Sequence, residues 1–404
     1  MFRLVIFVAA CVALAAARRS PNADYVEDLM KSPEGSRFSD NINEDALLDV
    51  VIHNVVTSDG YILELHRIPH GRGDTPGDRP AVLLVHGLLS SSADYLIMGP
   101  GNALGYLLAD AGYDVWLGNA RGNYYSRQHI SLNPDSILNK DFWRFSWDQI
   151  GLYDLPAFID YILKINGQDK LHYIGHSQGG TSFLVLNSLR PEYNEKFISF
   201  QGLAPASFFD NNENTMFNTL ANYESILETT AFALNAQEIF GSQDFITRHC
   251  VEGSIFNNFC QSALSGLFNR EYYNSTMLPV ILGHTPAGAA IRQVAHYGQV
   301  IRSNSFRRYN YNALTNLREY GSLTPPEYNL SLVTAPAYLH YGLADRQVDY
   351  RDLLKLANIL PNVVKVNQAE RETFNHFDFL WAMDVKEVMY DDIVASMRHA
   401  ELNL

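Results

Sequence analysis

The residues most suited to chemistry lie in the motif Gly-His-Ser-Gln-Gly at residues 175–179. A β-type run from Leu171 to Ile174 enters the motif, and a helix-compatible run from Thr181 to Arg190 leaves it. A nucleophile elbow needs this order of strand, tight turn and helix, because the turn holds its serine at a strained backbone angle with the hydroxyl exposed. Glycines before and after the serine leave room for such a turn. We therefore predict that Ser177 is a nucleophile.

A serine hydroxyl attacks well only when a base takes its proton and an acid orients that base. With a nucleophile elbow, the partners follow in the chain order serine, acid, histidine. His376 follows the last predicted strand and is the predicted base. His340 lies inside a predicted strand, and His399 lies at the end of the final predicted helix.

The acid is expected just beyond the predicted strand from Ala337 to Tyr341. Asp345 is nearest to the end of that strand, while Asp349 and Asp352 follow within a few residues. We predict Asp345 as the acid and keep the other two carboxylates as alternatives.

Attack on a carbonyl also needs hydrogen-bond donors that face the developing oxyanion, and losing one donor typically costs roughly 2.7–4 kcal/mol of barrier. The backbone N–H of Gln178, beside the serine, is one candidate. The second is the N–H of Leu88, which follows His86 and Gly87 at the end of an earlier predicted strand.

Predicted strands and helices alternate on both sides of the motif. A hairpin is expected at the start, followed by continuous apolar runs typical of buried parallel strands. Strands that alternate with helices imply an α/β fold, with a mostly parallel sheet flanked by helices. The predicted strands are Val51–Thr57, Tyr61–Ile68, Ala81–Val85, Tyr113–Leu117, Phe197–Leu203, Ala337–Tyr341 and Val363–Val366, and the predicted helices are Asn102–Ala111, Trp147–Ile165 and Asp384–His399.

The chain divides into four predicted regions. An early arginine, an apolar run and small residues predict a signal peptide over residues 1–17, followed by an N-terminal arm or short pro-segment over residues 18–44. The α/β core is expected at residues 45–207 and 329–404. Residues 208–328 lack clear strand alternation and predict several short helices. Because sheet signals occur on both sides of them, we predict that they form a helical cap over the serine, with an ordinary second helical domain as the alternative.

The composition of the chain argues against some classes of binding partner. The formal net charge of -14 argues against nucleic acid and against electrostatic docking on anionic membranes, so contact with lipid must be mainly apolar. No segment after the signal peptide predicts a transmembrane anchor, and no pattern indicates a metal site. In an oxidising compartment Cys250 and Cys260 predict a local disulfide, and Asn274 and Asn329 begin glycosylation sequons.

Several stretches together resemble the acid lipase family that includes gastric lipase and lysosomal acid lipase. The resemblance runs from about residue 45 to the end. The matching stretches are His86-Gly87-Leu88-Leu89, residues 107–119, Tyr153-Asp154-Leu155-Pro156-Ala157, residues 175–179, Pro286-Ala287-Gly288 and Asn375-His376-Phe377-Asp378-Phe379.

The resemblance implies an α/β-hydrolase fold with a helical cap and lid, and a secreted or lysosomal serine lipase that hydrolyses triacylglycerols or sterol esters without metal or organic cofactor. It assigns Ser177, Asp345 and His376 to the catalytic triad and Leu88 and Gln178 to the oxyanion hole. The expected partner is a neutral lipid droplet or emulsion interface, and the expected state is a monomer. Two alternatives stay open: a carboxylesterase or thioesterase acting on soluble esters, and a non-catalytic lipid-binding protein of the same fold.

Overall fold

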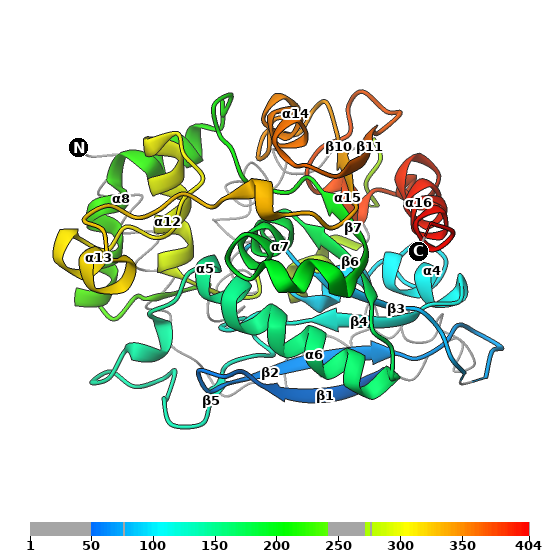
Figure 1. Cartoon of the computed structure of the whole chain (residues 1–404), viewed down its shortest axis with the longest axis horizontal. Coiled ribbons are helices and arrows are strands. Elements are labelled where there is room, and N and C mark those ends of the chain that lie inside the picture. The colour runs from blue at the N-terminus through cyan, green and yellow to red at the C-terminus, as the bar shows by residue number, and fades with distance from the viewer. Residues whose placement is uncertain (1–49, 76, 241–270, 275–276, 404) are drawn as a thin grey trace.

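The computed structural model describes residues 50–75, 77–240, 271–274 and 277–403 (Figure 1). The predicted signal peptide and the N-terminal arm or pro-segment therefore lie outside the described residues, as do Cys250 and Cys260 and their predicted disulfide. Among the described residues, no helix combines the length and the apolar character needed to cross a membrane.

One large sheet forms the centre of the molecule. Its strands follow the order β1-β2-β4-β3-β6-β7-β10-β11, with the short β5 paired to β2. Strands β3, β4, β6 and β7 are buried along their whole lengths, which explains their continuous apolar sequences. The strands are β1 (Val51–Val56), β2 (Tyr61–Ile68), β3 (Ala81–Val85), β4 (Asp114–Gly118), β5 (Gln128–His129), β6 (Leu171–His176), β7 (Phe197–Leu203), β10 (Ala337–Tyr341) and β11 (Val363–Gln368).

The sheet is antiparallel only at its beginning. The hairpin strand β2 pairs with β1 and β4 in antiparallel fashion, whereas every pairing from β4 through β11 is parallel. In a parallel sheet all carboxyl ends meet at one edge, where α/β proteins bind their ligands. The loops after β3, β6, β10 and β11 therefore share that edge.

Helices accompany the strands, and Figure 1 shows α6 and α7 lying in front of the sheet. Helix α6 begins with a proline in its first turn and ends at Gly167, whose positive φ of 66° suits glycine at a helix end. The helices of the core are α4 (Leu104–Asp110), α5 (Trp147–Gln149), α6 (Leu155–Asn166), α7 (Gln178–Leu189), α14 (Tyr350–Ile359), α15 (Asp378–Trp381) and α16 (Asp391–Glu401), with short helical turns at η2 (Ser92–Tyr95), η3 (Asp141–Trp143), η4 (Ile150–Asp154), η5 (Pro191–Lys196), η7 (Leu330–Leu332) and η8 (Lys386–Tyr390).

Two predicted helices are interrupted by π-helical turns. The helix expected from Trp147 to Ile165 is divided by η4, and the terminal helix expected from Asp384 begins with η8 before α16. Within η4, a Cβ at Gly151 would lie 2.6 Å from the side chain of Val185 on α7. Close packing between these two helices thus accompanies the irregular turn, and hydrophobic periodicity does not reveal it.

The chain between β7 and β10, hereafter the β7–β10 connection, contains the helices that differ most from prediction. Its described elements are α8 (Thr215–Ala233), α11 (Leu278–His284), α12 (Ile291–Ser303), α13 (Ala313–Tyr320) and a small antiparallel sheet of β8 (Glu238–Ile239) with β9 (Ala289–Ala290). Helix α8 has 19 residues, so the expectation of only short helices was wrong. Figure 1 shows α8, α12 and α13 grouped at one side of the sheet.

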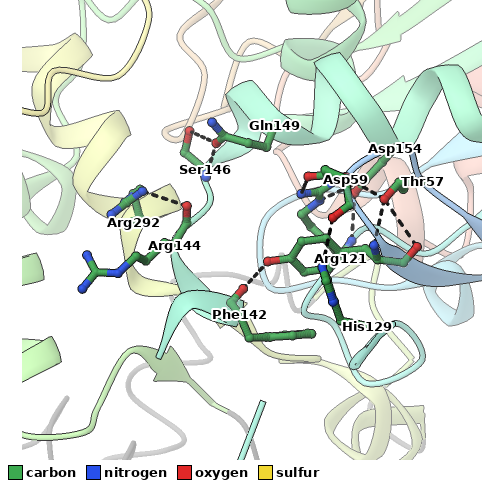
Figure 2. Close-up of polar contacts among 11 residues, drawn as sticks. Thr57, Asp59, Arg121, His129, Phe142, Arg144, Ser146, Gln149, Asp154 and Arg292 are labelled. Atoms are coloured by element: carbon green, nitrogen blue, oxygen red, sulfur yellow. Dashed lines mark hydrogen bonds and ion pairs between the residues drawn. The ribbon is translucent and has the colours of Figure 1, made fainter. Parts of the chain in front are cut away.

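A buried arginine joins the early hairpin to the core (Figure 2). Arg121 forms ion pairs with Asp59 in the hairpin turn at 2.6 Å and with Asp154 at 2.7 Å, and its guanidinium lies 3.9 Å from the ring centroid of Tyr61. Burial raises the pKa of Asp154 to about 6, although Arg121 opposes this shift. Removing one partner of such a pair leaves a buried uncompensated charge, which typically costs about 3–5 kcal/mol.

Candidate active site

The turn after β6 holds Ser177 in a strained conformation. Its φ is 51° and its ψ is -115°, and such backbone angles cost roughly 1–3 kcal/mol in a non-glycine residue. The Ser177 N–H donates to the carbonyl oxygen of Leu203 at 2.9 Å, which ties the turn to β7. Ser177 is half-buried, and its hydroxyl has no hydrogen-bond partner among the described residues.

The glycines around Ser177 are required by close approach of other backbone. A Cβ at Gly179 would lie 2.1 Å from the carbonyl oxygen of Val85, and a Cβ at Gly175 would lie 2.6 Å from the N of Gly180. A side chain at Gly179 would therefore clash with β3, and a side chain at Gly175 would clash with the start of α7. Helix α7 begins directly at Gln178, three residues earlier than the helix-compatible run suggested, so its N-terminus lies beside the serine.

Asp345 and His376 form a buried pair. Asp345 Oδ2 lies 2.7 Å from His376 Nδ1, and the two side chains are 1% and 6% exposed. The other carboxylate oxygen accepts the backbone N–H groups of Gln347 at 2.8 Å and Val348 at 2.9 Å, which fixes the orientation of the acid. Because the carboxylate binds Nδ1, the Nε2 of His376 is left as the nitrogen that can take a proton.

The acid loop and the base loop are also joined through their backbones. The N–H of Ala344 donates to the carbonyl oxygen of Phe374 at 3.1 Å. A Cβ at Gly342 would lie 2.2 Å from that same oxygen, so only glycine allows the two loops to approach this closely.

Within the described part of the chain, the competing acids have no hydrogen bond or ion pair with a histidine. Asp349 caps the start of α14 and forms an ion pair with Arg351 at 2.8 Å. Asp352 accepts a hydrogen bond from the side chain of Asn211 at 2.8 Å. Of the three carboxylates considered from sequence, the structure brings only Asp345 to His376.

The other two histidines considered as the base have different partners. His340 Nε2 lies 2.9 Å from the side-chain oxygen of Gln201, and His399 Nδ1 lies 3.2 Å from the hydroxyl of Tyr338.

His176 links the serine turn to the base, and sequence reasoning missed it. Its Nε2–H donates to the backbone carbonyl of His376 at 3.0 Å, and the two ring centroids are 4.6 Å apart. Burial, reinforced by the neighbouring His376, lowers the pKa of His176 well below the ordinary histidine value, so its ring stays neutral. The only available signal was its position directly before Ser177.

The two predicted oxyanion donors are both available. Among the described residues, neither the N–H of Leu88 nor that of Gln178 has a hydrogen-bond acceptor. The loop after β3 runs next to the serine, since a Cβ at Gly87 would lie 3.2 Å from Ser177 Cβ. His86 holds this loop by donating from Nδ1 to the Gly87 carbonyl at 2.8 Å, and burial lowers the pKa of His86 to about 4.

The β7–β10 connection contacts the loop that carries Leu88. The N–H of Ala287 donates to the carbonyl of Leu89 at 2.7 Å, and the hydroxyl of Thr285 donates to Asp94 at 2.7 Å. Asp94 also accepts the hydroxyl of Ser90, and burial raises its pKa to about 6. The segment around residues 285–287, which the sequence marked only through the family motif, therefore supports this loop.

The part of the chain that the structure describes contains no group of three or more histidine, cysteine, aspartate or glutamate side chains that could hold a metal ion.

Comparison with known proteins extends the geometric result. A family model described as the alpha/beta hydrolase fold matches residues 80–382, and a partial alpha/beta-hydrolase lipase region matches residues 43–99. The crystal structure of a mutant epoxide hydrolase from Bacillus megaterium superposes with a TM-score of 0.51 at 14% identity, covering 86% of this chain and all of that one. At this identity the likeness shows the fold alone. The chain is an α/β hydrolase, which confirms the predicted fold class.

Relatives of closer sequence define the family within that class. The chain is 42% identical to Lipase 1 of Drosophila melanogaster over 90% of its own length and 82% of that protein. It is 38% identical to gastric triacylglycerol lipase of Bos taurus over 86% of its own length and 87% of that protein. The chain therefore belongs to the family of lipases that includes gastric triacylglycerol lipase, which are ester hydrolases. The resemblance inferred from its motifs is confirmed.

Proposed function

We propose that the protein hydrolyses triacylglycerols at a lipid–water interface through a covalent acyl-enzyme. The observation that supports this most directly is the buried Asp345–His376 pair, whose histidine contacts the residue next to Ser177. The gastric triacylglycerol lipases among the relatives suggest the substrate class. We include sterol esters in the proposal as a second substrate class, because the same steps would hydrolyse them.

In the first half-reaction the Ser177 oxygen attacks the ester carbonyl carbon, and its proton passes to His376 Nε2. The carbonyl oxygen becomes an oxyanion that accepts the N–H groups of Leu88 and Gln178. Asp345 keeps the proton on Nδ1 and stabilises the positively charged imidazolium. Collapse of the intermediate breaks the ester bond, and His376 returns the proton to the departing diacylglycerol.

In the second half-reaction a water molecule attacks the acyl-serine ester while His376 takes its proton. The same two N–H groups stabilise the second oxyanion. Collapse releases a fatty acid and returns the proton to Ser177. His176 remains neutral because of its burial, so it adds no positive charge next to the imidazolium that forms in each half-reaction.

We further propose that residues 208–328 form a cap over this site, and that a signal peptide directs the protein to the secretory route, to an extracellular or lysosomal destination. Contacts between residues 285–287 and the Leu88 loop support the cap. The exposure of Asn329 is compatible with glycosylation on that route.

The test combines labelling with turnover. A fluorophosphonate probe should label wild-type protein on Ser177, as located by peptide mass spectrometry, and emulsified triolein should be cleaved faster than dissolved p-nitrophenyl butyrate at equal ester concentration. Labelling with a preference for the dissolved ester would indicate a soluble-ester carboxylesterase. Folded protein that is not labelled would indicate a lipid-binding protein. Parallel assays on cholesteryl oleate decide between glyceride and sterol ester.

A further inference from the structure

The side chain of Gln178 contacts a helix of the β7–β10 connection. Its Nε2 donates to Oε1 of Gln293 on α12 at 2.6 Å, and the two residues are each 3% exposed. The residue whose N–H faces the oxyanion in the proposed mechanism is therefore held, through its side chain, by a helix of the β7–β10 connection.

A second contact joins the same two helices one turn further along. The hydroxyl oxygens of Thr181 on α7 and Tyr297 on α12 are 3.1 Å apart. Positions 178 and 181 are three apart on one helix, and positions 293 and 297 are four apart on the other, so each pair shares a helix face. The first turns of α7 thus lie directly against α12.

Helix α12 is itself firmly attached to the core. The buried ring of His296 stacks on Trp147 with centroids 3.6 Å apart and hydrogen-bonds to the hydroxyl of Ser146 at 3.0 Å. Arg292 donates to the carbonyl of Arg144 at 2.7 Å (Figure 2) and forms an ion pair with Glu228 of α8 at 2.6 Å. These contacts make α12 a fixed support for Gln293.

We infer that Gln293 is a positioning residue that sets the direction of the Gln178 N–H towards the oxyanion. Gln178 is the first residue of α7, so its N–H has no acceptor within the helix to orient it. A buried amide that loses its partner moves to find another, because an unsatisfied polar group is costly. Without Gln293, the side chain of Gln178 would rearrange and carry its backbone N–H with it. This inference rests on the proposed function.

The experiment compares two glutamine-to-leucine changes on the same helix. Gln293→Leu removes the contact with Gln178, whereas Gln299→Leu removes two hydrogen bonds to the backbone of Asn310 within the β7–β10 connection. Both variants are assayed on dissolved p-nitrophenyl butyrate, so that binding to an interface does not enter. A short-chain alkyl trifluoromethyl ketone is the second probe, since Ser177 adds to its carbonyl carbon and leaves an oxyanion in the same position.

We expect Gln293→Leu to lower kcat by about 10- to 100-fold with little change in KM, because small misplacements of catalytic groups cost rates of this order. Its affinity for the trifluoromethyl ketone should fall by a similar factor. Gln293→Glu, which keeps an acceptor for the Gln178 amide, should recover most of the activity, and Gln299→Leu should resemble wild type.

A second variant tests the same contact without changing Gln293, in case Gln293→Leu does not fold. Gln178→Met removes the pair from the other side and keeps the backbone N–H, so it should show the same loss of kcat, and the double variant should lose no more than either single one. Equal behaviour of Gln293→Leu and Gln299→Leu, or additive losses in the double variant, would overturn the inference. If wild-type protein hydrolyses no ester and Ser177 is not labelled, the proposed function itself has failed instead.

Discussion

Among the described residues, serine, histidine and acid side chains come together at Ser177, at Ser92 and at Ser199, where His172 hydrogen-bonds to both Ser199 and Glu401. Besides Ser177, His376 and Asp345, the hydroxyl of Ser92 lies 2.9 Å from Nδ1 of His66, whose Nε2 lies 2.6 Å from Glu64. By residue type and distance, the Ser92 set would pass as a triad.

Ser177 and Ser92 differ in their surroundings. Ser92 is 1% exposed and its hydroxyl accepts from the side chain of Asn119 at 3.0 Å, whereas Ser177 is only half-buried. The N–H after Ser92 donates to the hydroxyl of Ser91 at 3.3 Å, while the N–H after Ser177 has no acceptor among the described residues. Chemistry therefore depends on an accessible oxygen and unused donors, and the Ser92 set serves to join β2 to η2.

The largest expected effect is the difference in kcat between variants of Ser177 and Ser92. Ser177→Ala should lower kcat on a dissolved ester by roughly 10⁴-fold or more, because the nucleophile is lost while the fold is kept. Ser92→Ala should leave kcat within about twofold of wild type and lower the free energy of unfolding by about 1–3 kcal/mol, since it leaves buried polar partners unsatisfied.

Turnover and urea denaturation of the two variants provide the measurements. If folded Ser92→Ala loses nearly as much turnover as Ser177→Ala, the stated difference between the two serines is wrong.

The next largest effect is the difference in kcat between variants of the acids Asp345, Glu64 and Asp349. Asp345→Asn should lower kcat by roughly 10³–10⁴-fold, because an amide no longer selects the tautomer with its proton on Nδ1. Glu64→Gln should change kcat by less than about threefold, since Glu64 belongs to the set joined to Ser92. Asp349→Asn is the matched control near the active site. If Asp349→Asn loses more activity than Asp345→Asn, the acid has been assigned to the wrong residue.

The smallest effect concerns stability near Ser92. Burial raises the pKa of Asp94 from the ordinary 3.8 to about 6 in the folded protein, so the folded state holds this proton more tightly than the unfolded chain does. The stabilisation from protonation is therefore fully present below about pH 4 and is lost as the pH rises through 6. Since tenfold in proton affinity is worth about 1.4 kcal/mol, the effect is at most roughly 3 kcal/mol.

Asp94→Asn, which cannot titrate, supplies the reference. The difference in unfolding free energy between wild type and Asp94→Asn should shift in favour of wild type as the pH falls from 7 to 4. A difference that stays constant over this range would show that Asp94 titrates normally.

Much of the fold could be predicted because buried parallel strands carry continuous apolar runs. The predicted bounds of β3, β7 and β10 match the structure residue for residue. The division of the helix from Trp147 to Ile165 could not be predicted, because the turn η4 accompanies close packing of Gly151 against Val185 on α7, which hydrophobic periodicity does not reveal.

The residues of the candidate site also differ in how far the sequence could predict them. Ser177 could be found because a nucleophile elbow has a local pattern of glycines, strand and helix. Asp345 was predicted as the acid from its place after a strand, but the sequence could not exclude Asp349 and Asp352. The role of His176 had no signal beyond its position directly before Ser177, and the role of Gln293 had none. Each of those depends on contacts between residues far apart in the chain.

By itself, the sequence determined the order of the strands and helices, the strained turn at Ser177 and the family, because these depend on neighbouring residues and on their spacing. The tertiary structure alone decided which carboxylate reaches His376, which serine of the serine–histidine–acid sets is only half-buried, and which helix supports Gln178. The physical reason is that hydrogen bonds, burial and pKa shifts are set by distances in space, which the folded chain creates between segments far apart in the sequence, as between His176 and His376, which are 200 residues apart.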